Sequence, residues 1–88
     1  FPVVAVVVAY PGAAPEAVEA DIVQPIEEAV STISGLDVTQ STAQAGQALV
    51  IMQFDLSVSS GQAAQDVRDK IAQIAGALPE NANDPVTL

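Results

Sequence analysis

The segment Val3–Ala9 reads VVAVVVA, so every one of its side chains is apolar and most are β-branched. Valine side chains are stiff and pack well on a pleated surface, which predicts a β-strand. Because apolar side chains point to both sides of it, we expect this strand to be buried on both faces. Tyr10-Pro11-Gly12 then ends it with a turn. A strand of this kind belongs in the interior of a sheet, with other strands on both sides.

An amphipathic helix is predicted after the turn. Pro15 suits its first position, where a missing N–H costs nothing, and Gly35 is the expected C-terminal stop. Apolar residues at spacings of three and four form one stripe, which predicts the face that enters the core. This stripe consists of Val18, Ile22, Ile26, Val30 and Ile33.

Pro25 lies in the interior of this helical pattern. A proline there lacks an N–H and crowds the carbonyl of Asp21, four residues back, at a cost of about 3 kcal/mol or more. The apolar spacing continues in phase from Ile22 to Ile26, so we expect a kink at Pro25 with helix on both sides and a freed Asp21 carbonyl. Two explanations for the proline stay open: a curve that wraps the helix over a twisted sheet, or a hinge.

Two further strands are predicted next. Leu36–Ala43 is polar enough to be an edge strand, with one face formed by Leu36, Val38, Gln40 and Thr42. Ala45-Gly46 is a plausible hairpin turn. Ala48–Leu56 is apolar on both faces in its first half, which places it in the middle of the sheet.

A second helix is expected over Ser60–Leu78, with Ser59 or Ser60 as its N-cap and Pro79 as its stop. Its predicted core stripe is Val67, Ile71, Ile74, Ala75 and Leu78. On the opposite side, a second line is polar at its start and small at its end: Gln65, Asp69, Ala72 and Gly76. Small residues on an exposed face let another helix approach closely, so this line is either accidental or an interface.

The predicted order is β-α-β-β-α-(β), with the start of a last strand at Val86–Leu88. Right-handed crossovers on this order give the ferredoxin-like α+β sandwich, an antiparallel sheet with two helices on one face. We expect residues 1–88 to form a single domain of this kind whose fourth strand is truncated. Because helices cover one face only, apolar residues on the other face need a cover from this chain or from a partner.

The composition excludes several classes of protein. Eleven acidic residues stand against two basic ones, Arg68 and Lys70, so the net charge is −9 and no nucleic-acid partner is expected. The chain has neither Cys nor His, and it contains no phosphate-binding loop and no nucleophile elbow. We therefore expect no enzymatic activity, no cofactor and no metal. Glu27-Glu28 is interpreted as a solvated face, since neighbours on a helix point about 100° apart.

A set of short motifs is spread along nearly the whole chain. It consists of Tyr10-Pro11-Gly12-Ala13, Pro15-Glu16, Val18-Glu19, Pro25-Ile26-Glu27-Glu28, Ile33, Gly35-Leu36, Ser41-Thr42, Phe54, the run Ala63–Lys70 and Leu78-Pro79. Together these motifs resemble the first periplasmic porter (pore) subdomain of resistance-nodulation-division (RND) multidrug efflux transporters. The family pattern usually has Ser or Asp where this chain has Ala14, and G-T-D within the stretch that here is Ser57–Gly61. These departures leave the resemblance intact.

The resemblance implies a piece of a homotrimeric, proton-driven efflux pump of the inner membrane, lying on its periplasmic side. The partners that it implies are the other porter subdomains, a periplasmic adaptor and an outer-membrane channel. It also implies that the second helix lines the trimer axis with Gln65, Asp69, Ala72 and Gly76. The piece itself is expected to be soluble, since its longest apolar run, Val3–Ala9, is far shorter than the ~20 residues of a membrane helix.

Two other functions are known for folds of this kind and make different demands on the sequence. A free-standing ferredoxin-like ligand-binding or regulatory module would usually show a complete fourth strand and a glycine-rich binding loop at a helix start. An acyl-phosphate hydrolase on the same fold needs an arginine in the first strand–helix loop, and Tyr10–Pro15 contains no basic residue. The first alternative stays open, whereas the second is disfavoured.

Overall fold

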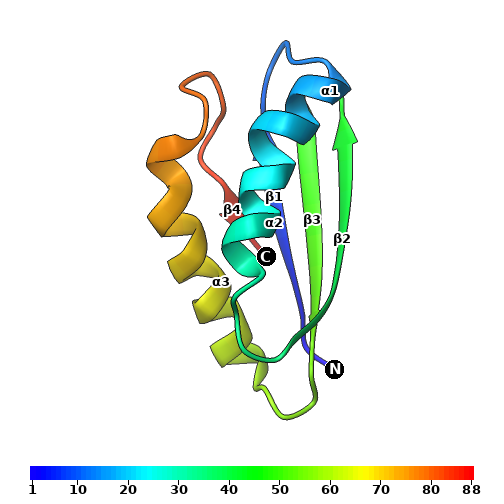
Figure 1. The fold of residues 1–88 in the computed structure, drawn as a ribbon, viewed down its shortest axis with the longest axis vertical. Coiled ribbons are helices and arrows are strands. Elements are labelled where there is room, and N and C mark those ends of the chain that lie inside the picture. The colour runs from blue at the N-terminus through cyan, green and yellow to red at the C-terminus, as the bar shows by residue number, and fades with distance from the viewer.

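β1 (Val3–Ala9) lies inside a four-stranded antiparallel sheet whose order is β2-β3-β1-β4 (Figure 1). The computed structural model describes residues 1–88. The other strands are β2 (Leu36–Gln44), β3 (Gln47–Phe54) and β4 (Val86–Thr87). The sequence therefore predicted correctly that the first and third strands are central and that the second is an edge. The strand order and the helices confirm the ferredoxin-like α+β plan.

The helices form one layer on one face of the sheet (Figure 1). The first helical rod consists of α1 (Pro15–Val18), the π-helical turn η1 (Glu19–Val23) and α2 (Gln24–Val30). The second consists of α3 (Ser60–Ile74) and the 3₁₀ turn η2 (Ala75–Ala77). The two rods contact each other through α2 and α3. Ser59 caps α3 as expected, because its hydroxyl accepts a hydrogen bond of 3.2 Å from the Gln62 amide.

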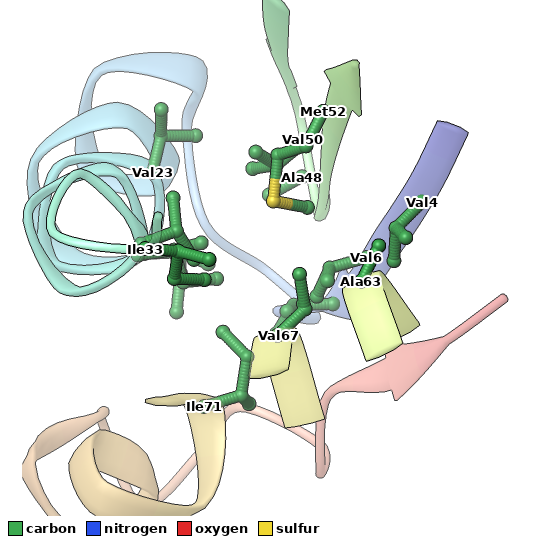
Figure 2. Close-up of a cluster of buried hydrophobic side chains, with 14 of the residues drawn as sticks. Val4, Val6, Val23, Ile33, Ala48, Val50, Met52, Ala63, Val67 and Ile71 are labelled. Atoms are coloured by element: carbon green, nitrogen blue, oxygen red, sulfur yellow. The ribbon is translucent and has the colours of Figure 1, made fainter. Parts of the chain in front are cut away.

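The core fills the space between these two layers and is entirely apolar (Figure 2). The sheet contributes Val4, Val6, Val8, Ala48, Val50, Met52 and Phe54. The helical layer and the turn after α2 contribute Val18, Ile22, Val23, Ile26, Val30, Ile33, Ala63, Val67 and Ile71. Every residue of the first predicted stripe is buried. Val23 and Ala63 are additional, and Ala75 of the second predicted stripe is exposed.

The expectation that β1 is buried on both faces is correct only for one face. Val4, Val6 and Val8 face the helices and are fully buried, whereas Val7 is half-buried and Val3 is 51% exposed. Helices cover one side of the sheet only, so the other side remains open. We call this uncovered side the open face. Its apolar residues are the ones for which the sequence predicts a cover from this chain or from a partner.

The first helical rod ends at Val30 and not at Gly35. The hydroxyls of Ser31 and Thr32 donate to the carbonyls of Glu28 and Ala29, which competes with continuation of the helix. Gly35 instead takes a positive φ of 84° in the turn that leads into β2.

The facing of one residue pair and the ends of two elements also differ from the prediction. A β-bulge between Leu36 and Val38 turns these residues to opposite faces, so Leu36 packs against the core and Val38 does not. β3 ends at Phe54 because Asp55 begins a side-chain-stabilised turn, which leaves Leu56 80% exposed. α3 ends at Ile74 and is followed by η2, and the helical rod stops at Ala77 because Leu78, which precedes Pro79, is extended.

Candidate interaction surfaces

The line predicted on the second helix lies on the exposed side of that rod. Gln65, Asp69 and Ala72 belong to α3, while Gly76 lies in η2, and all four are exposed. The Nε2 of Gln65 donates a hydrogen bond of 2.7 Å to the Oδ1 of Asp69, so the polar half is ordered by its own residues. A Cβ placed on Gly76 would meet no atom within 4 Å. No other part of this chain therefore covers the half of the line that has small residues.

A shallow hollow adjoins this line. It lies between α3 and the C-terminal segment, with Ile71 and Ala72 in its lining and Arg68 and Asp84 among its polar groups. Ala72 thus belongs both to the line and to the hollow. A larger residue in place of Ala72 would therefore protrude into both the line and the hollow.

The strands carry a single charged residue, Asp37 at the bulge of the edge strand β2, although the chain has a net charge of −9. Strand register places an apolar centre on the open face, formed by Val3, Ala5, Val7, Leu49, Ile51 and Val86, and a polar uncharged border of Gln and Thr side chains from β2 and β3. Val3 and Val86 are each about half exposed. Such a face is suited to packing against another apolar surface and not to binding an ion.

Pro25 is the second residue of α2, and helix is present on both sides of it. The π-helical turn η1 directly precedes α2, and the Gln24 amide donates to the Glu19 carbonyl, five residues back. A π turn is a feature that no apolar spacing in the sequence had indicated. It changes the surroundings of Pro25, because the helix before it is not α-helical.

Several motif residues hold the fold together through side-chain contacts. The hydroxyl of Tyr10 donates to Asp21 Oδ2 at 3.3 Å, joining the end of β1 to η1. Partial burial raises the pKa of the Tyr10 phenol, and the nearby Asp21 carboxylate adds to the effect by its charge and as hydrogen-bond acceptor. The pKa of Asp55 is lowered by hydrogen bonds from the backbone and side chain of Ser57. These contacts stabilise turns and suggest no catalytic chemistry.

Glu27 has a structural partner that sequence reasoning missed. Its Oε2 accepts a partly buried hydrogen bond of 2.7 Å from the Ser41 hydroxyl, which joins α2 to the edge strand β2. Glu28 remains exposed, as expected of a solvated face. No local pattern could reveal the contact, because its partners meet only when the sheet and helix pack. The two residues belong, however, to two of the motifs that carried the resemblance.

Ser41→Ala should lower the free energy of unfolding by about 1–2 kcal/mol, because it leaves a half-buried carboxylate oxygen without its donor. Thr42→Ala is the matched control, since Thr42 is the exposed neighbour on the opposite face of β2. Denaturant unfolding measures both. A double-mutant cycle with Glu27→Ala should show that the two substitutions are coupled. Equal losses for Ser41→Ala and Thr42→Ala would show that the bond contributes nothing.

The structure shows no group of acidic side chains arranged to hold a metal ion. None of its helices has both the length and the apolar character needed to cross a bilayer.

Comparison with known proteins assigns a family to this arrangement. Residues 1–87 match the model of the AcrB/AcrD/AcrF family. A protein from Yersinia enterocolitica called multidrug resistance protein MdtC is 37% identical over 79 residues, which is 90% of this chain and 8% of that protein. MdtC proteins from Yersinia pseudotuberculosis and Yersinia pestis are 34% identical over the same shares. This chain spans about 8% of the length of these relatives. The match over nearly all of its residues confirms the resemblance to RND transporters, and the chain belongs to the AcrB/AcrD/AcrF family.

Proposed function

We propose that this chain is a porter subdomain, residues 1–88, on the periplasmic side of a proton-driven RND efflux pump of the inner membrane, exporting drugs or other amphiphiles. Family membership supports the proposal, as does the name of the MdtC relatives, which are called multidrug resistance proteins. The single observation that carries the subdomain role is the exposed line of α3 and η2, which becomes small at Ala72 and Gly76. Three copies of this rod meet at the trimer axis through that line.

The open face of the sheet supports the same role. Its only charged strand residue is Asp37 at the edge, and Val3 and Val86 of its apolar centre are each about half exposed in this chain. In the assembled pump the other porter subdomains cover this face, and the cover changes as rigid subdomains move during transport. A periplasmic adaptor and an outer-membrane channel complete the pump.

Cysteine cross-linking in the intact pump tests the trimer axis directly. Asp69→Cys should give an inter-protomer disulfide under mild oxidation, because Asp69 would face its own copies across the axis. Asp37→Cys is the control, since Asp37 is also an exposed aspartate but lies on β2, at the sheet edge away from α3. Residues 1–88 contain no cysteine, and the unsubstituted pump shows whether cysteines elsewhere in it cross-link. If Asp69→Cys yields no product on a non-reducing gel, or no more than Asp37→Cys, Asp69 does not lie on the axis.

A further inference from the structure

The first helical rod contains one residue more than a plain α-helix would need. In η1 the Gln24 amide bonds to Glu19, five residues back, and such a π turn accommodates one extra residue between two α-helical segments. If Ala20 is left out of the count, then Ile22, Val23 and Ile26 stand three, four and seven residues after Val18. That is the ideal spacing of an amphipathic α-helix. All four of these residues are fully buried.

The extra residue and Pro25 compensate for each other. In a continuous α-helix the ring of Pro25 would crowd the Asp21 carbonyl, which lies within η1, and the bond to that carbonyl would be lost. With the wider turn before it, Pro25 instead occupies the second position of α2, where a proline is tolerated. Pro25 thus disfavours an unbroken α-helix in this rod. The π turn in turn removes the free-energy cost that an interior proline would have.

Side chains fasten the rod on both sides of this point. Asp21, within η1, accepts from Tyr10 at the end of β1, and Glu27, within α2, accepts from Ser41 of β2. Bending at Pro25 would move these acceptors relative to the sheet and break one of the two bonds. It would also withdraw Ile22 or Val23 from a core that buries both completely.

We infer that η1 and Pro25 form a matched device that locks the first helical rod in a single register, so that the rod moves with the sheet as one rigid unit. This role differs from the hinge that the sequence left open. It does not depend on the proposed function. It requires that the extra residue and the proline be coupled: either one is tolerated with the other and harmful without it.

Deletion of Ala20, an exposed residue of η1, tests this coupling in the intact polypeptide that carries residues 1–88. Hydrogen exchange of the amides from Ile26 to Val30 is the measurement, because it reports local opening. The deletion alone places Pro25 within a plain α-helix and should speed exchange by about a hundredfold. The deletion combined with Pro25→Ala should restore most of the protection, since a plain helix then satisfies the same core.

Pro15→Ala is the matched control, because Pro15 occupies the first helical position and should not rescue the deletion. Should the deletion variant fail to fold, its accumulation in cells replaces exchange as the readout and is compared across the same set. A rescue of tenfold or more that is specific to Pro25→Ala supports the inference. A smaller rescue, or an equal rescue by Pro15→Ala, overturns it.

Discussion

Gly35→Ala should lower the free energy of unfolding by about 2–4 kcal/mol, as the sum of a backbone term and a steric term. Gly35 has a φ of 84°, a conformation that costs an L-residue about 1 kcal/mol or more. A Cβ at this position would also overlap the Cγ2 of Val58. Val58 packs against the core and the Gly35 carbonyl accepts from the Asp55 amide, so neither side of the contact can withdraw freely.

Gly12→Ala separates the backbone cost of a positive φ from the steric cost of the contact with Val58. Gly12 has nearly the same φ, 81°, but a Cβ there meets nothing within 4 Å, so we expect a loss of only about 1 kcal/mol. Chemical denaturation followed by circular dichroism measures both variants. Val58→Ala in the Gly35→Ala background should recover part of the loss, because it removes the overlapping methyl group. If Gly35→Ala costs no more than Gly12→Ala, the contact with Val58 is not rigid.

Gly35 also illustrates what the sequence could and could not predict. The sequence predicts that the helix stops at Gly35, but the helix ends five residues earlier, at Val30. The spacing of apolar residues extends through Ile33, which is indeed buried, yet it is buried from a turn and not from a helix. Periodicity reports which residues face the core, and the hydroxyls of Ser31 and Thr32 decide where the helix stops.

Strand position was predictable, whereas strand register was not. The largely apolar sequences of β1 and β3 were sufficient to place them centrally. Helices nevertheless cover only one face of these two strands. The bulge that separates Leu36 from Val38 has no local signature, since it depends on how β2 pairs with β3. One additional residue in a strand reverses the faces that follow, and a simple alternation cannot reveal it.

The candidate surfaces also have one part that was predictable from the sequence and another that was not. The exposed line of Gln65, Asp69, Ala72 and Gly76 follows from helical spacing alone, and its exposure agrees with that spacing except that Gly76 lies beyond the α-helix. The contacts of Tyr10 with Asp21 and of Glu27 with Ser41 join residues far apart in the sequence. They could not be derived from the residues, because they depend on the packing of the two layers.

Phe54→Ala should be the most damaging single truncation in this chain, with a loss of about 3–5 kcal/mol. Phe54 is only 1% exposed and is the sole aromatic residue of the core. The residues around the cavity that it would leave are mainly valine and isoleucine, whose branched side chains have few alternative rotamers with which to fill it. An 88-residue domain is stable by about 4–13 kcal/mol in total, so this variant should approach unfolding at room temperature.

Phe1→Ala is the matched control for this prediction, because it removes the same side chain from a position that is 71% exposed. Its effect should stay within about 0.5 kcal/mol. Phe54→Leu should lie between the two, since leucine fills much of the volume and leaves a smaller cavity. Thermal unfolding monitored by circular dichroism ranks the three variants. If the Phe54→Ala domain is as stable as the Phe1→Ala domain, the core must collapse to fill the space of the missing ring. In that case the pairing of β3 with its neighbouring strands contributes more to stability than the packing of its core-facing side chains.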